Sequence, residues 1–446
     1  MSRVARAHGF LDPIALMARM QNFAQPSEVS EPIELLRAGV ILHARGLINS
    51  RVIQHNLDWV WPFWVERQFD PRDVAFVPRA FSITHINLTH RNWTAVGLPD
   101  FDELPIIDPH GLVTPIYDAW SIDAWVINDE GDSLLPSRLK TVDQQLKVKS
   151  APMVITQAAH EGMALRAETA TIIKNAKPVC ITRYRAVSDK AGWLVVALRP
   201  YNPEGISFIH NIKLLDAQTC WQVNGKDEVR FSEAVERHHV SDYAHGDVYI
   251  HLHDSAQQVK GECDIGMATA AALYRLQPGE AKDLVVEVPL EHGQVPKGDT
   301  LNASDDWATT LSKACQLSIP DKHFQFLYDA AIQTLVLHSP EDVYPGPYTY
   351  KRFWFRDAAF ILNALLCAGF YDRVKRTLNL FPERQTRLGY FRSQDGEWDS
   401  NGEALWIMHR YCQMRDCEPD LAWQQAISRG AKWIVRKRLP DYPVSP

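Results

Sequence analysis

The side chains best suited to acid and base chemistry lie within one stretch of the chain, residues 350–406. Arg356 and Asp357 follow an aromatic run, FWF, and open an apolar helical pattern. Further along, Glu397, Asp399 and Glu403 lie within DGEWDSNGEALW, beside tryptophans. Neighbouring carboxyl groups in different surroundings can hold opposite protonation states, which general acid and base catalysis requires. Carboxylates framed by aromatic rings at the mouths of buried helices are typical of sugar chemistry, so this stretch predicts a glycosidase-like site.

The three acids differ in spacing. Asp399 and Glu403 are four residues apart, so both could face one cleft, whereas Glu397 tends to point elsewhere. Trp398 offers an apolar wall that would raise the pKa of a neighbouring carboxyl group by desolvation. The cluster can therefore supply the acid for inverting glycoside hydrolysis. The same cluster is poorly placed to supply the general base as well. That group must approach from the other side of the sugar ring, about 6.5–9.5 Å from the acid.

The same residues also have a structural interpretation. Arg356 and Asp357 could form an ion pair at a helix N-terminus, where an acid favours the helix dipole. The acids of 397–403 could belong to a solvated loop, with Asn401 capping the next helix. The residues alone leave both interpretations open.

Helices are expected to position this stretch, because the apolar period after Asp305 is close to 3.6. Asp321 and Asp372 suit helix N-caps, and Gly369 suits the position after a helix end. The helix that opens at Arg356 is apolar nearly all round and is expected to be buried on every side. The expected helices cover about 321–338, 356–368, 372–381, 401–415 and 420–438.

Strands are expected before the helices. Short β-branched and aromatic segments alternate with turn residues, and the alternation over 164–173 and 248–253 is typical of half-buried strands. Many strands without intervening helices predict an antiparallel sandwich. The expected domains are an N-terminal helix and linker (1–32), a large β-sandwich (33–290), a linker (291–304) and a helical domain (305–446).

FWFRDAAF and DGEWDSNG together resemble motifs of the six-hairpin glycosidases, especially glucoamylase-type and amylo-α-1,6-glucosidase-like glycoside hydrolases. The first resembles the motif that opens the first inner helix of those enzymes, and the second resembles their general-acid loop. A large β-sandwich before a helical domain is also the architecture of bacterial members. The resemblance implies a partial (α/α)6 toroid and action on α-glucosidic bonds in oligo- or polysaccharides.

The resemblance also implies roles for single residues. Arg356 and Asp357 match the pair that hydrogen-bonds sugar hydroxyls in the innermost subsite, and Asp399 matches the general acid. The family's acid is normally Glu, and Asp is one methylene shorter. Glu403 is therefore a rival, because debranching-type relatives place an acid just before the Ala-x-Trp of the following helix; Glu397 is the third candidate. The remaining expected substrate-binding residues are Trp354, Trp398 and Asn401.

The family's general base comes from the last hairpins of the toroid, beyond the helices expected here. We therefore expect a base that is not visible in this chain, and an isolated chain that is a poor hydrolase or inactive. The alternatives are a non-catalytic carbohydrate-binding or assembly subunit and an inactive fragment. Besides the saccharide, the sequence allows for a partner chain or a homo-oligomer that covers the incomplete helical domain. Phosphorolysis would need basic residues near 397–403 to hold phosphate, and none cluster there.

Composition narrows the class of protein further. A net charge of -7 and the lack of a long Lys/Arg block argue against nucleic-acid binding. We see neither an apolar stretch of membrane-spanning length nor a secretory signal, and the seven scattered cysteines favour a reduced, cytoplasmic location. No cofactor motif or metal-ligand spacing is present, so we expect neither a cofactor nor a metal.

Two further groups of residues invite functional claims. His251 and His253 are two apart, so in a strand they would share one face, and an exposed strand face is a better explanation than a metal site. The aromatic residues of the segment 59–64 could form a sugar platform. Packing in a core or at a domain interface is the preferred interpretation for them.

Overall fold

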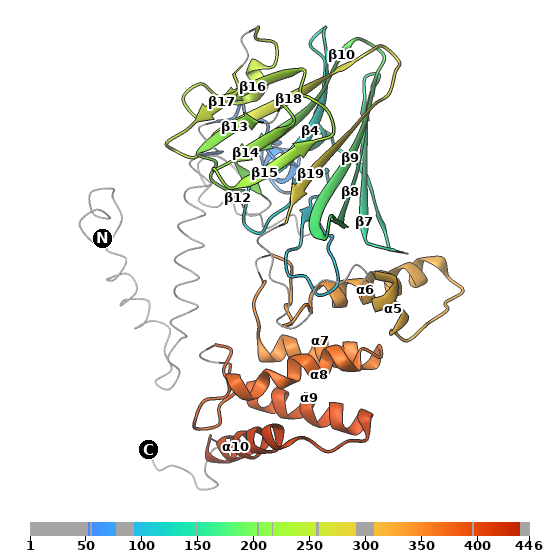
Figure 1. Cartoon of the computed structure of the whole chain (residues 1–446), viewed down its shortest axis with the longest axis vertical. Coiled ribbons are helices and arrows are strands. Elements are labelled where there is room, and N and C mark those ends of the chain that lie inside the picture. The colour runs from blue at the N-terminus through green and yellow to red at the C-terminus, as the bar shows by residue number, and fades with distance from the viewer. Residues whose placement is uncertain are drawn as a thin grey trace, which may run out of the picture.

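The computed structural model describes residues 52–53, 56–76, 93–290 and 307–437, except for 149, 203, 204, 216, 256, 257, 349, 395 and 396. The expected N-terminal helix and linker (1–32) and the linker 291–304 lie outside the described residues. Layers of β-sheet form one end of the molecule, and helices are stacked below them (Figure 1). The domain boundaries themselves stay a prediction.

Two large antiparallel sheets form the β part, as the sequence predicts. The first has the order β1 (Thr94–Ala95), β2 (Ile106–Ile107), β3 (Val113–Thr114), β4 (Ser121–Asn128), β10 (Gly192–Arg199), β18 (Thr269–Leu276) and β16 (Arg237–Ser241), with β5 (Ser133–Leu134) paired to β4. The second has the order β17 (Lys260–Glu262), β13 (Asn211–Leu215), β14 (Cys220–Val223), β15 (Asp227–Phe231), β19 (Lys282–Pro289), β9 (Lys177–Ser188), β8 (Met163–Lys174), β7 (Met153–His160) and β6 (Asp143–Lys147). The strands β11 (Tyr201–Asn202) and β12 (Gly205–Ile206) form a separate two-stranded antiparallel sheet.

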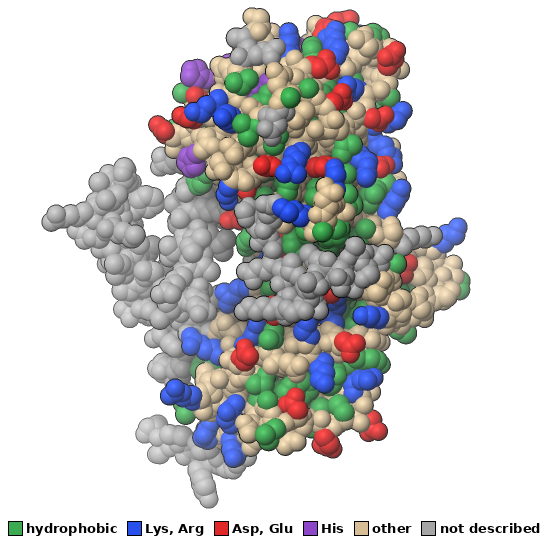
Figure 2. Space-filling view, in the orientation of Figure 1, with side chains coloured by type: hydrophobic (Ala, Val, Ile, Leu, Met, Phe, Trp, Pro, Cys, Tyr) green, Lys and Arg blue, Asp and Glu red, His purple; other side chains and the backbone are tan. Residues whose placement is uncertain are grey.

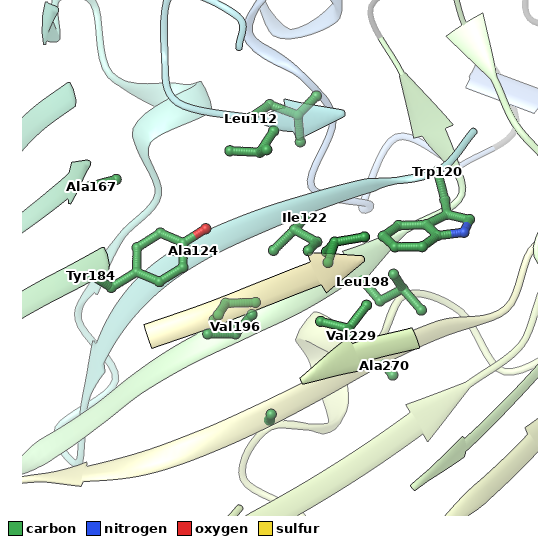
Figure 3. Packing of buried hydrophobic residues seen from close by; sticks show 14 of the residues in the cluster. Leu112, Trp120, Ile122, Ala124, Ala167, Tyr184, Val196, Leu198, Val229 and Ala270 are labelled. Atoms are coloured by element: carbon green, nitrogen blue, oxygen red, sulfur yellow. The ribbon is translucent and has the colours of Figure 1, made fainter. Parts of the chain in front are cut away.

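Alternating side chains of both sheets share one core. In β4, Ile122 and Ala124 point into this core with Tyr184 of β9 and Val196 of β10 (Figure 3). Trp125 points to the opposite face of the same sheet, into a second cluster. Successive side chains of a strand point to opposite faces, so the first sheet is buried on both sides. The expected strand over 164–173 is confirmed by β8.

The expected strand over 248–253 is wrong, because the segment forms the 3-10 helix η3 (Val248–His251). Asp247 caps it by accepting a hydrogen bond from the Tyr249 N–H. Val248 and Leu252 are both buried against the outer face of the first sheet. So short an alternation of apolar and polar residues also fits one helical turn, which here buries Val248 and Leu252 on the same side. His251 and His253 therefore do not share a strand face.

The aromatic residues of 59–64 pack in the core, as preferred from the sequence. Trp59 and Trp61 stack at 5.7 Å between ring centroids, and Trp61 also contacts Tyr201. Phe63 and Trp64 are buried at the start of α4 (Phe63–Phe69). Their preferred role in packing is confirmed.

The helices follow the 3.6-residue period, and each of the five expected helices is present. Asp321 caps α6 by accepting from His323 and Phe324, and Gly369 has φ 91° after α7, both as predicted. Asp372 is not a cap, because α8 begins one residue before it. The described helices are α4, η2 (Pro136–Arg138), η3, α5 (Trp307–Ser312), α6 (Lys322–Leu337), α7 (Phe355–Cys367), α8 (Tyr371–Asn379), η4 (Phe381–Arg384), α9 (Ser400–Arg415) and α10 (Leu421–Lys437).

One face of α7 is exposed, so the prediction that this helix is buried on every side is wrong. Leu362 and Leu366 pack in the helical core, whereas Phe360 is 62% exposed and Arg356 and Cys367 are also exposed. The expectation assumed neighbours on every side, and none of the described residues covers this face fully. No helix within the described part of the chain is both long and apolar enough to span a membrane.

Direct contacts join the strands and helices. Trp307 Nε1 donates to the Gly97 carbonyl at 3.0 Å, and the side chain of Arg373 binds Asp100 at 2.8 Å. Leu104 from the β part packs into the helical core. Figure 2 shows acidic and basic side chains intermingled over the β layers, with no large patch of one sign on that face. The contacts of Trp307, Arg373 and Leu104 join α5, α8 and the helical core to the segment between β1 and β2.

Candidate functional site

The N-termini of α7 and α9 bring the predicted residues together. Arg356 lies in the first turn of α7, Asp399 directly precedes α9, and Glu403 lies in the first turn of α9. Residues about forty positions apart in the sequence therefore meet where two packed helices begin. Both helix N-termini carry partial positive charge, which favours carboxylates nearby.

Arg356 pairs with acids of α9. Its Nε donates to Asp399 Oδ2 at 2.9 Å and lies 3.7 Å from Glu403 Oε1. The side chains of Arg356 and Asp399 are 59% and 42% exposed, so the pair lies at an open surface. The alternative interpretation, an Arg356–Asp357 ion pair, is wrong, because the guanidinium turns to Asp399 and Glu403 instead.

Glu403 differs from an ordinary surface glutamate in its pKa. Burial raises its pKa to about 7, the Asp399 charge acts in the same direction, and Arg356 opposes both. Its Oε2 is buried without a hydrogen-bond partner among the described residues. A carboxyl group that is protonated near neutral pH and has one unpaired oxygen can donate a proton to a ligand.

Glu397 has different surroundings. It is buried, and its Oε1 accepts from the backbone N–H of Arg356 at 3.0 Å. Its Oε2 accepts from the Ser393 hydroxyl. Burial raises the Glu397 pKa, and hydrogen bonds from the backbone of Arg356 and Phe355 oppose the rise. Glu397 therefore binds the start of α7, a role that the sequence did not indicate.

One oxygen from each of Glu397, Asp399 and Glu403 lies within 4.8 Å of the other two, the one such group of possible metal ligands found within the described residues. The Arg356 side chain already supplies the positive charge that these carboxylates attract. We therefore assign no metal ligand here.

Asp357 lies beside this cluster with its carboxylate unengaged. Within the described residues, no hydrogen bond or ion pair ties its side chain to the protein, and it is partly exposed. Its charge contributes to the raised pKa of Glu403, which places it near that carboxyl group. A free carboxylate at this position can accept hydrogen bonds from ligand hydroxyls.

Aromatic rings border the acids. Trp398 is 52% exposed. Its ring stacks on that of Trp433, with 6.2 Å between the ring centroids and an interplanar angle of 13°. Trp433 in turn stacks on Tyr390 at 4.9 Å. Trp354, the residue before α7, contacts the ring of Tyr350 at 5.9 Å. Trp398 thus presents a supported apolar face to solvent, and sequence analysis missed Tyr390 and Trp433 because they join only in the fold.

Asn401 is fully buried, and its amide is used by the protein. Its Oδ1 accepts from the Phe391 N–H at 2.8 Å, and its Nδ2 donates to the carbonyls of Gly389 and Gly430. The interpretation of Asn401 as the cap of α9 is wrong, because α9 already begins at Ser400. Its expected contact with substrate finds no support in this geometry.

A comparison with solved structures finds a bacterial glucoamylase complexed with acarbose, at a TM-score of 0.57 and 10% sequence identity. A putative kojibiose phosphorylase from the human microbiome has a TM-score of 0.36 at 9% identity, covering 66% of this chain and 46% of that chain. A family GH92 α-mannosidase from Bacteroides thetaiotaomicron has a TM-score of 0.37 at 10% identity, covering 76% and 62%. The last two similarities are too low to carry an argument.

The glucoamylase match covers 79% of this chain and 59% of that chain, so this chain spans about three fifths of the length of that enzyme. No family model and no curated protein matches the sequence. The resemblance stated from FWFRDAAF and DGEWDSNG is confirmed at the level of fold: large antiparallel sheets followed by helices, in a glucoamylase-like arrangement.

Proposed function

We propose that this chain carries the acid side of a glycoside hydrolase site that acts on α-glucosidic bonds in oligo- or polysaccharides. The observation that carries the proposal is the pairing of Arg356 with Asp399 beside Glu403, whose pKa is about 7. The glucoamylase-like fold supports it, as does the acarbose bound by that enzyme. We also propose that α6 to α10 form part of an (α/α)6 toroid.

Each residue has a role in this proposal. Glu403 donates its proton to the glycosidic oxygen as the bond to the sugar breaks, and the leaving group departs as an alcohol. Water adds to the anomeric carbon, and its proton passes to a general base outside the three acids. Asp399 holds Arg356 in place and, by its charge, favours the protonated form of Glu403. Asp357 accepts hydrogen bonds from sugar hydroxyls. Trp398 packs against the C–H face of a sugar ring.

The general base of an inverting reaction lies outside the three acids. Their oxygens approach within 4.8 Å, whereas an inverting pair needs about 6.5–9.5 Å to admit water. The short spacing is closer to the roughly 5–5.5 Å of a retaining pair. Proton NMR of the first-formed product separates the two mechanisms, because β-glucose from an α-glucoside indicates inversion.

A second function follows from the same observation. A chain that has the acid but no opposing base would bind saccharide without cleaving it, as a carbohydrate-binding or assembly subunit. Saturable binding of maltose and maltotriose with no release of glucose favours this alternative. Release of glucose contradicts it.

The general-acid role is tested by Glu403→Gln with two substrates. Maltose has a poor leaving group that needs protonation, whereas a dinitrophenyl α-glucoside does not. We expect kcat/KM for maltose to fall by about 10²–10⁴-fold and that for the aryl glucoside to fall far less. Glu418→Gln, at an exposed glutamate beyond the other end of α9, is the matched control. Equal losses on both substrates, or no loss on maltose, would contradict the assignment of Glu403.

A further inference from the structure

Glu397 joins the two segments of the site through the backbone of α7. Its carboxylate is separated from the Arg356 N–H by 41 residues in sequence and by 3.0 Å in space. Trp354, the residue before α7, provides no side-chain cap for that helix. A helix start leaves backbone N–H groups without intrahelical partners, and Glu397 accepts hydrogen bonds from those of Phe355 and Arg356.

The other contacts of Glu397 fix its own segment. Its second carboxylate oxygen accepts from the Ser393 hydroxyl, and its backbone carbonyl accepts from the Tyr390 hydroxyl at 3.1 Å. The same carbonyl accepts from the Ser400 N–H at the start of α9. Glu397 is therefore bound to α7, to the preceding loop and to α9 at once.

We propose that Glu397 is a positioning residue, whose carboxylate fixes the first turn of α7 against the start of α9 and so holds Arg356 between Asp399 and Glu403. This inference rests on the function proposed above, in which Glu403 is the acid. Glu397 does not act on the glycosidic bond itself, because its buried carboxylate is already engaged by Ser393 and by backbone N–H groups.

A second consequence concerns charge. The charged groups that act on Glu403 are Asp399, Glu397 and Asp357, which raise its pKa, and Arg356, which lowers it. Glu397 therefore contributes negative charge as well as hydrogen bonds. A glutamine at 397 would keep an acceptor for the α7 N–H groups and remove the charge.

The test uses the pKa of Glu403 in the full chain without ligand. Carbon-13 NMR of protein labelled at the glutamate carboxyl carbon gives the titration midpoint, with the signal identified by its loss in Glu403→Gln. We expect Glu397→Gln to lower the Glu403 midpoint by about 0.5–1 pH unit, as expected for one charge removed at about 5 Å in a water-like dielectric. Glu383→Gln, at an exposed glutamate of η4, should leave the midpoint unchanged.

Hydrogen exchange supplies the second readout. In Glu397→Ala, the amides of Phe355 and Arg356 should exchange at least about tenfold faster than in the wild type, because their hydrogen bonds to the carboxylate are lost. The same Glu403 midpoint in wild type and Glu397→Gln, or unchanged exchange in Glu397→Ala, would overturn the proposal. Neither readout needs a substrate, so failure of the glycosidase proposal would appear separately, as absent sugar binding.

Discussion

An arginine–carboxylate pair lies in each part of the molecule, and the two pairs differ in what surrounds them. Arg199 and Asp247 are both fully buried in the β part, with Nη1 and Oδ1 at 2.6 Å. Arg356 and Asp399 lie at the helix N-termini and are about half exposed. The buried Arg199–Asp247 pair can therefore stabilise the fold but cannot contact a ligand, whereas the exposed Arg356–Asp399 pair is accessible to one.

The hydrogen bonds of the two pairs differ as well. Arg199 also donates to the Tyr201 hydroxyl and the Val60 carbonyl, and Asp247 also accepts from the N–H groups of Val60 and Tyr249. Beside Arg356, by contrast, Glu403 Oε2 has no partner among the described residues. The buried set is complete without a ligand, whereas the set around Arg356 includes a buried carboxyl oxygen, Glu403 Oε2, whose hydrogen-bonding capacity is unused.

The largest expected effect is on stability, from removing one charge of each pair. Asp247→Asn removes the carboxylate that pairs with the buried Arg199 charge, so we expect the free energy of unfolding to fall by about 3–5 kcal/mol. Asp399→Asn should cost no more than about 1 kcal/mol, because its pair is exposed. Urea denaturation followed by circular dichroism measures both. Equal losses in the two variants would remove the distinction between the pairs.

The next effect is the dependence of stability on pH. Burial raises the pKa of Asp108 to about 7 and that of Asp123 to about 6, both in the β part. Groups with raised folded-state pKa values stabilise the fold fully below the unfolded pKa and lose this contribution as pH rises through the folded pKa. These two carboxyl groups should therefore lower the free energy of unfolding by roughly 2–4 kcal/mol between about pH 4 and 7. Burial lowers the pKa of His238 and His338 to about 4, which acts in the opposite direction, so the effect is measured as the difference between wild type and variant. Asp108→Asn should flatten this decrease, and an unchanged pH profile in that variant would contradict the assignment.

The smallest expected effect is that of removing the Trp398 ring, which lies beside the Arg356–Asp399 pair. Trp398→Ala should weaken saccharide binding by about 2–10-fold, the equivalent of about 0.5–1.5 kcal/mol for one stacking contact. Its effect on stability should be small, because Trp398 is half exposed. Trp61→Ala, within the buried aromatic cluster, should do the reverse. Isothermal titration with maltotriose and thermal unfolding of both variants measure the two effects.

The sequence predicted the helices well, because their apolar period runs over many turns and Asp321 and Gly369 mark helix ends. It failed at Val248–His253, where six residues are too few to separate a strand from a helical turn. It also could not show the open face of α7, since exposure depends on neighbours and not on the apolar content of the helix itself.

The site was predicted in outline. Spacing alone indicated that Asp399 and Glu403 share a side, and the structure has both beside Arg356. The partners of Glu397 and Asn401 could not be predicted, because their hydrogen bonds join segments far apart in sequence. The choice between Asp399 and Glu403 depended on burial and on where Arg356 points, which only the tertiary structure gives.

Binding of acarbose tests most directly the central claim, that the Arg356–Asp399 pair belongs to a saccharide site. Isothermal titration would compare the wild type with Asp357→Ala, because the Asp357 side chain forms no hydrogen bond or ion pair with the described residues and its removal should leave stability unaffected. Asp372→Ala, in the first turn of the neighbouring helix α8, is the matched control. The account predicts binding to the wild type and to Asp372→Ala, and at least about tenfold weaker binding to Asp357→Ala. Equal affinity of all three proteins, or no binding by any of them, would contradict it.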